Sequence, residues 1–193
     1  MPRRVLSCQR MGAVTKQWTE AELMALPRDG RKREFISGEI VVSPAGGFLH
    51  GDVAVAIASL LYAHVRARKL GYVFDGQTGF WMMSGNLLSP DVSFVAQSRF
   101  SGDERPTGFL HGAPDLAVEI LSPSQSQKEL DEKCRELLAN GSRLVWIVSP
   151  LERSVRVLSR EAAEQIRGER DTIDGGAVLP EFSVPVSDFF PAR

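Results

Sequence analysis

Apolar residues recur along this chain with two spacings, one typical of helices and one typical of strands. Residues 51–69 carry Val53, Ile57, Leu61 and Val65 on one helical face, which predicts a long amphipathic helix. The other predicted elements are helices that begin at capping boxes at 19–22 and 126–129, and strands at 34–36, 39–42, 72–74, 79–82, 92–96, 116–121, 144–148 and 155–157.

Four other stretches complete the predicted outline. Ser37-Gly38 lies between two short apolar runs and predicts a tight hairpin turn. Residues 97–113 are rich in Gly, Pro and charge and predict an exposed loop, and residues 161–170 predict a solvated helix or loop. Residues 182–190 predict a terminal strand or clasp. The order of elements predicts an α/β domain built around one mixed sheet.

The composition changes this picture little but limits the classes of function. The chain has 193 residues, of which 43% are hydrophobic and 24% charged, as in a soluble globular protein. This length predicts one folded domain over residues 18–193, after a flexible leader over residues 1–17. The net charge of −1 excludes a global basic field, so DNA binding would depend on a local basic patch and a metal.

Cysteine content and hydropathy predict a cytoplasmic location. Cys8 and Cys134 form no Cys-x-x-Cys pair, and Cys134 falls on the apolar side of a predicted helix, which favours a free thiol in a reducing compartment. The leader lacks the apolar segment of a secretory signal. The longest apolar stretch, residues 53–62, is too short to span a bilayer, so no membrane partner is expected.

Two carboxylates stand within or beside apolar stretches that predict buried strands. Asp91 directly precedes one such strand, and Glu119 lies inside another. Ionised carboxylates resist transfer out of water. A shared hard cation such as Mg2+, or Mn2+ in its place, takes oxygen ligands and offsets that cost. The sequence therefore predicts a divalent metal site at Asp91 and Glu119.

Lys133 is predicted to reach the same site from the next helix. Glu119 lies about 7 Å before the end of its strand, and Lys133 lies about 9 Å into the helix that follows. The two come level if the helix folds back across the sheet. The alternative is a solvated lysine that pairs with Glu129 or Glu136 on its own helix.

Glu39 and His50 are further candidates with simple structural alternatives. Glu39 follows the predicted hairpin turn, and a solvated turn residue is its structural alternative. His50 heads the long helix and projects onto its apolar face, so a packed core histidine is the alternative. The positive end of the helix dipole is expected to keep this imidazole neutral and able to act as a ligand or base.

Several enzyme classes are excluded by their missing motifs. The sequence has no Gly-x-Ser-x-Gly nucleophile elbow, no phosphate loop of the Gly-x4-Gly-Lys-Ser/Thr type and no Gly-x-Gly-x-x-Gly dinucleotide fingerprint.

Several segments match a known family in order and spacing. They are Phe-Ile-Ser-Gly-Glu-Ile-Val-Val-Ser-Pro at 35–44, His50, Gly-Phe at 79–80, Ser-Pro-Asp-Val-Ser-Phe-Val at 89–95, Pro-Asp-Leu-Ala-Val-Glu-Ile-Leu-Ser-Pro-Ser at 114–124, Lys133, and Leu-Val-Trp-Ile-Val at 144–148. Over residues 18–190 the chain thus resembles the Uma-two family of "putative restriction endonucleases", which belongs to the PD-(D/E)XK nuclease superfamily. The resemblance implies a restriction-endonuclease-like core, with a central mixed sheet flanked by helices.

The resemblance also implies roles for single residues. Asp91 and Glu119 match the residues that bind Mg2+, Lys133 matches the family's lysine, and Glu39 and His50 match two further site positions. Three other positions depart from the expected pattern. Leu121 stands where the wider superfamily has its lysine, Ser37 stands where the family usually has Asp, and Leu88 stands where a basic residue often precedes Ser-Pro-Asp. The change at Leu88 weakens the case for phosphate binding.

The predicted function is a metal-dependent DNA endonuclease. Asp91 and Glu119 would bind Mg2+ or Mn2+, and Lys133 would orient or deprotonate a water and stabilise the transition state. Two alternatives remain: a non-catalytic binding or assembly protein on a nuclease-like fold, and a hydrolase of another phosphate ester. A homodimer or larger homo-oligomer is expected, with contacts through the apolar Phe189-Phe190 end and the loop around Phe109.

Overall fold

A computed structural model describes residues 18–27, 31–102, 106–122 and 126–192, so the predicted leader at 1–17 lies outside the described residues. In chain order the elements are α1 (Glu20–Met24), β1 (Arg33–Ile36), β2 (Glu39–Val42), α2 (Phe48–Arg68), β3 (Gly71–Asp75), β4 (Phe80–Trp81), β5 (Leu87–Leu88), β6 (Val92–Ala96), η1 (Gln97–Arg99), β7 (Leu110–His111), β8 (Leu116–Ile120), α3 (Gln127–Ala139), β9 (Leu144–Ser149), β10 (Ser154–Ser159), β11 (Gln165–Gly168), β12 (Thr172–Gly175), β13 (Leu179–Pro185) and η2 (Val186–Phe189).

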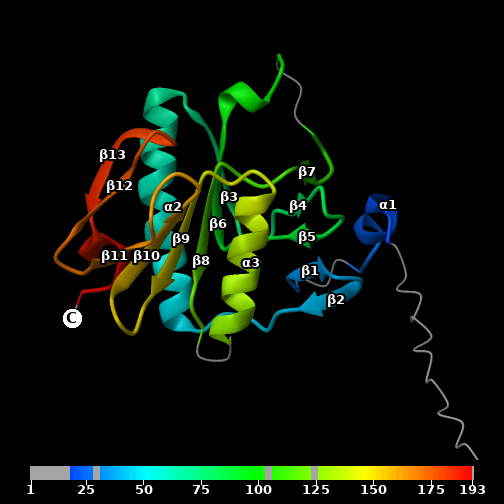
Figure 1. Cartoon of the computed structure of the whole chain (residues 1–193), viewed down its shortest axis with the longest axis horizontal. Helices are drawn as coiled ribbons and strands as arrows, with labels where there is room; N and C mark the ends of the chain where they lie inside the picture. Colours follow the sequence, from blue (N-terminus) through cyan, green and yellow to red (C-terminus); the bar gives the residue numbers. More distant parts are fainter. Residues whose placement is uncertain (1–17, 28–30, 103–105, 123–125, 193) are drawn as a thin grey trace, which may run out of the picture.

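The strands form a central mixed sheet and two smaller ones. The central sheet has six strands in the order β11-β10-β9-β8-β6-β3, and the β8–β9 pair is parallel while its neighbours are antiparallel. Figure 1 shows α2 and α3 on opposite sides of this sheet. A second sheet has the order β2-β1-β5-β4-β7, and β12 pairs with β13. The structure confirms the predicted mixed α/β fold.

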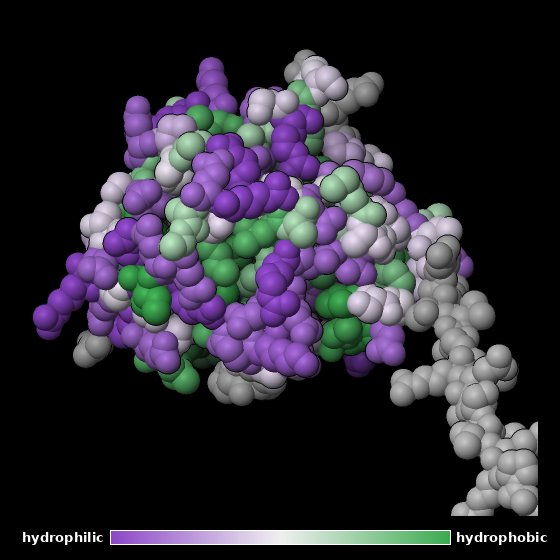
Figure 2. Space-filling model, viewed as in Figure 1, coloured by the Kyte–Doolittle hydropathy of each residue, from purple (hydrophilic) through white to green (hydrophobic). Residues whose placement is uncertain are grey.

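The two faces of β8 point into two separate parts of the core. Val118 and Ile120 pack with the buried residues of α2 on one face, and Ala117 packs with Leu130 and Cys134 of α3 on the other. Because side chains alternate along a strand, Glu119 shares the α3 face with Ala117. In the view of Figure 2, hydrophilic side chains cover most of the surface, and hydrophobic side chains show beside α3.

Helix α2 begins three residues earlier than the sequence predicted. By length and composition alone, it is the one helix in the described ranges that is apolar enough to cross a membrane. Its Val53, Ile57, Leu61 and Val65 are at most 1% exposed and pack against the central sheet. This packing accounts for the buried face of α2, whereas Phe48, Val55 and Tyr62 are exposed.

The sequence predictions were wrong for residues 161–170 and 97–113, and they missed strand β12. Residues 161–170, predicted as a helix or loop, contain strand β11, which pairs with β10. Strand β11 is an edge strand with Gln165 and Ile166 exposed, so its sequence lacks the alternation of a half-buried strand. Strand β12 was not predicted, and the predicted loop at 97–113 contains η1 and β7.

The predicted self-association contact at the carboxyl-terminal end is also wrong. Phe189 is fully buried and Phe190 is 7% exposed, and both belong to the core beneath α2. Phe189 lies 5.9 Å from Trp146 between ring centroids. These aromatic rings cover the protein's own sheet, so they present no surface to a second copy.

A capping box fixes the start of α3, as the sequence predicted. The Ser126 hydroxyl accepts a hydrogen bond from the backbone N–H of Glu129, and the Glu129 carboxylate accepts from Ser126 in return. At the other end, Gly141 has a φ of 126°, a value that favours glycine just beyond a helix.

We expect Ser126→Ala to lower the free energy of unfolding by about 1 kcal/mol, because the first turn of α3 loses a side-chain acceptor. Urea unfolding followed by circular dichroism measures the change. Ser101→Ala, at an exposed serine outside any helix, is the matched control and should stay within about 0.5 kcal/mol of the parent. Equal effects of the two substitutions would show that the cap does not stabilise the fold.

Candidate active site

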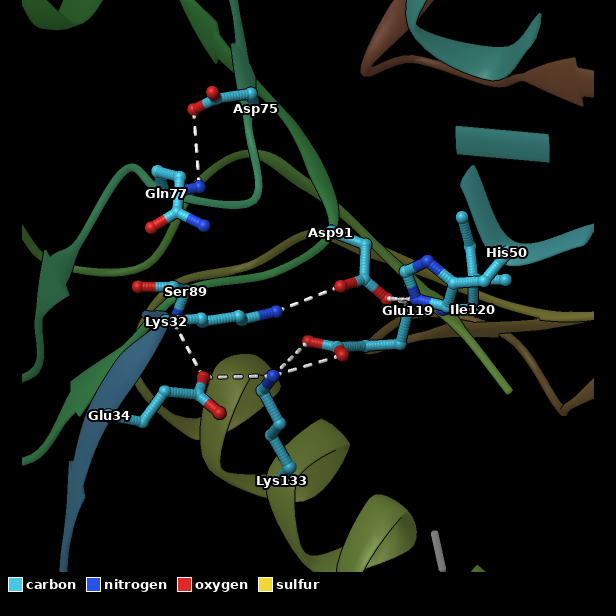
Figure 3. Close-up of polar contacts among 10 residues, drawn as sticks. All are labelled: Lys32, Glu34, His50, Asp75, Gln77, Ser89, Asp91, Glu119, Ile120 and Lys133. Carbon is cyan, nitrogen blue, oxygen red and sulfur yellow. Dashed lines mark hydrogen bonds and ion pairs between the residues drawn. The ribbon is translucent and has the colours of Figure 1, made fainter. Parts of the chain in front are cut away.

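Strand pairing brings Asp91 and Glu119 together. Val92 of β6 pairs with Val118 of β8 in an antiparallel register, so Asp91 and Glu119 come next along the same pair. The backbone N–H of Ile120 also donates to Oδ2 of Asp91 at 2.9 Å. Both carboxylates therefore lie at one end of the central sheet, as Figure 3 shows.

Lys133 reaches this end of the sheet from α3. Its neighbours Leu130, Cys134 and Leu137 are fully buried against the sheet, which fixes the rotation of the helix. The Lys133 ammonium lies 2.8 Å from Oε1 and 3.0 Å from Oε2 of Glu119. The folded-back geometry predicted for Lys133 is the one observed, and the solvated alternative is wrong.

The β1–β2 hairpin adds two charged residues that the sequence analysis missed. Glu34 Oε1 lies 2.9 Å from the Lys133 ammonium and accepts a hydrogen bond from the backbone N–H of Ser89 at 2.7 Å. Lys32, just before β1, donates to Asp91 Oδ1 at 2.8 Å. Lys32 and Glu34 both stand in the charged run Arg-Lys-Arg-Glu at 31–34, a pattern that singles out none of its members.

His50 joins the site, and Glu39 lies at its edge. His50, in the first turn of α2, places Nε2 3.2 Å from Asp91 Oδ2, so it is a residue of the site and not of the core. Glu39 is exposed on β2 and lines the same cavity. No direct contact joins Glu39 to Asp91, Glu119 or Lys133 among the contacts of the described residues.

A cavity of about 1100 Å³ opens over these residues, and its walls are strongly acidic. The basic side chains that line it are those of Arg31, Lys32, His50 and Lys133. The carboxylates that line it are those of Glu34, Glu39, Asp75, Asp91, Glu119, Glu129, Glu132 and Glu136. A cation is therefore attracted into this cavity more strongly than an anion.

Burial and neighbouring charges shift the pKa values of Asp91, Glu119 and Lys133. Burial works to raise the pKa of Asp91, but the hydrogen bond from His50 and the charge of Lys32 outweigh it and hold this pKa well below its usual range. Burial raises the pKa of Glu119 to about 7, against the opposing charge of Lys133. Burial works to lower the pKa of Lys133, but Glu119 and Glu34 outweigh it and raise this pKa.

His50 does not titrate as the sequence predicted. We expected the helix dipole to keep the imidazole neutral. The hydrogen bond with Asp91 instead raises the pKa of His50, although burial opposes this shift. The hydrogen-bonded Asp91 carboxylate, 3.2 Å away, thus favours the charged form of the imidazole.

Comparison with known proteins identifies the family of this chain. The family model described as "Putative restriction endonuclease" matches residues 20–187. The chain belongs to this Uma2 family. No curated protein matches the Uma2 chain. A crystal structure described as a "putative nuclease belonging to DUF820", from Anabaena variabilis, is similar with a TM-score of 0.77 and 23% identity, and the match covers 90% of this chain and 97% of that one. This likeness supports the nuclease-like fold.

The acidic end of the sheet has the oxygen atoms that a divalent metal needs. Oε1 of Glu119 is buried and accepts no well-aligned hydrogen bond from the described residues, although it is close to Lys133. Within the described ranges, no group of three or more His, Cys, Asp or Glu side chains is arranged to hold a metal ion. Mg2+ commonly takes one or two carboxylates and completes its shell with water and phosphate. Asp91 and Glu119 fit that ligand set.

Proposed function

We propose that this Uma2 protein hydrolyses phosphodiester bonds in DNA with the help of a divalent metal. The observation that carries the proposal is the meeting of Asp91, Glu119 and Lys133 at one end of the sheet, with an ammonium 2.8 Å from a buried carboxylate. A buried carboxylate with so few polar partners costs stability, which indicates that its position serves a purpose other than folding. Membership in a nuclease-like family supports the same activity.

Each residue has a distinct role in the proposed reaction. Asp91 and Glu119 would hold Mg2+ or Mn2+, which lowers the pKa of a bound water and neutralises charge on phosphate. Lys133 is kept as an ammonium by two carboxylates, so it would serve as a hydrogen-bond donor to the attacking water or to a phosphate oxygen and not as the base. The proton of the metal-bound water would pass to solvent. His50 positions Asp91 through its hydrogen bond to Oδ2.

Cleavage of supercoiled plasmid DNA by the purified full-length chain tests the proposal. We expect nicked and linear products with Mg2+ or Mn2+ and none after chelation with EDTA. Isothermal titration with Mn2+ should show binding in the absence of DNA. A chain that neither binds Mn2+ nor cuts DNA under any of these conditions would contradict the proposal.

The acidic cavity favours a second function, that of a non-catalytic binding protein. Eight carboxylates line the cavity against three Lys or Arg side chains, a balance that repels the DNA backbone when no metal is bound. Such a protein would self-associate or bind a cationic partner without cutting DNA. Hydrolysis of a generic phosphodiester without any cleavage of DNA would instead indicate an enzyme for another phosphate ester.

A further inference from the structure

The Lys32 ammonium contacts Asp91 on the side of the carboxylate that faces Glu119 and Lys133 (Figure 3). Oδ2 of Asp91 already accepts a hydrogen bond from the Ile120 backbone and contacts His50. Oδ1 contacts the Lys32 ammonium at 2.8 Å. In Figure 3 the tip of Lys32 points between Asp91 and the Glu119–Lys133 pair. A metal ion shared by Asp91 and Glu119 would therefore take the place of this ammonium.

The backbone of Lys32 is fixed, but its side chain is able to move. The Lys32 carbonyl accepts a hydrogen bond from the Ser43 backbone N–H at 3.1 Å, which ties this residue to the end of the β1–β2 hairpin. The side chain is 16% exposed and ends in the open cavity. Four rotatable bonds let a lysine ammonium move by several ångströms while its Cα stays in place.

The charges at the site give Lys32 a reason to move when a metal binds. Without metal, three carboxylates (Glu34, Asp91 and Glu119) face the ammonium groups of Lys32 and Lys133 and the imidazole of His50. A divalent cation beside Asp91 adds two positive charges to this group. The like charges of the metal and Lys32 then repel each other at short range. When DNA is bound beside the metal, a phosphate of the substrate offers the displaced ammonium a new anionic partner.

Resting on the nuclease function proposed above, we propose that Lys32 is a substrate-binding residue that exchanges partners. Without metal its ammonium neutralises Asp91, and with metal and DNA it contacts a phosphate of the substrate. Lys32 thus keeps Asp91 paired while no metal is present.

Two binding measurements on the full-length chain test this exchange. Free Mn2+ is followed by electron paramagnetic resonance, and DNA affinity is measured in Ca2+ over a series of salt concentrations. We expect Lys32→Met to bind Mn2+ about tenfold more tightly, because a competing cation is gone. The same variant should bind DNA more weakly and lower the log–log salt slope by about one, the signature of one lost phosphate contact.

Matched variants separate this effect from a general loss of charge. Lys32→Arg keeps the cation and should keep a parent-like salt slope. Lys128→Met makes the same substitution at an exposed lysine of α3 and should leave both measurements unchanged. Lys32→Gln repeats the test with a polar head if Lys32→Met does not fold.

The two proposals fail in different ways. A parent chain that binds neither Mn2+ nor DNA overturns both the nuclease function and the exchange. A parent that binds both, with a Lys32→Met variant whose Mn2+ affinity is unchanged or weaker, overturns the exchange alone. An unchanged salt slope in that variant also overturns it, because Lys32 then makes no phosphate contact.

Discussion

Glu119→Gln is expected to slow DNA cleavage by roughly 10³-fold or more at saturating Mg2+, which corresponds to about 4 kcal/mol or more of lost transition-state stabilisation. The amide keeps the size of the side chain but supplies no negative charge to a divalent cation. Quantified nicking of supercoiled plasmid measures the rate. Mn2+ binding in the same variant should weaken together with the rate.

The control for this prediction is Glu161→Gln, a change of the same chemistry at an exposed position outside the active-site cavity. It should cut DNA at the rate of the parent. Asp91→Asn offers an independent repeat on the neighbouring strand and should lose activity to a similar degree. If Glu119→Gln cleaves as fast as the parent, the metal role of the two carboxylates is wrong.

Lys133→Met is expected to lower the free energy of unfolding by about 3–5 kcal/mol. The substitution leaves Glu119 and Glu34, which are 2% and 6% exposed, without the ammonium that they share. A buried carboxylate that has lost its partner must either stay charged in a poorly polar site or take up a proton. Urea unfolding in the presence of EDTA measures the loss without interference from metal.

Two further variants test the cause of that loss. Lys128→Met removes an exposed lysine from the same helix and should change stability by less than about 0.5 kcal/mol. The triple variant Lys133→Met, Glu34→Gln and Glu119→Gln removes all three charges and should recover most of the lost stability. A triple variant that is no more stable than Lys133→Met alone would show that packing around the lysine stem, and not the ion pairs, stabilises this region.

Local sequence patterns were sufficient to predict the central part of the site. Asp91 and Glu119 stand in short apolar segments whose strand character is plain, and the distance along the helix places Lys133 level with Glu119. These three positions depend on one βα connection and one pair of neighbouring strands. The fold class follows from the same elements, since β8 and β9 are buried on both faces.

Local sequence patterns could not predict that residues at the start of the β1–β2 hairpin join the site. Glu34 and Lys32 come close to Lys133 and Asp91 because β1 pairs with β5, where Phe35 lies opposite Leu87. That pairing joins segments about fifty residues apart, and β5 has only two residues. The metal site, the DNA substrate, the cytoplasmic location and self-association remain predictions for experiment.

The Lys133 ammonium and the carboxylates of Asp91 and Glu119 are held in place by different contacts. Asp91 and Glu119 are tied to each other by backbone hydrogen bonding between strands, whereas Lys133 depends on how α3 rests on the sheet. A small translation of α3 along its axis would lengthen the distance from Lys133 to Glu119 and leave the spacing of the two carboxylates unchanged. Under the proposed nuclease function, affinity for the ion and speed of the chemical step would thus be open to independent adjustment, either by natural variation or by an engineer who repacks that single helix.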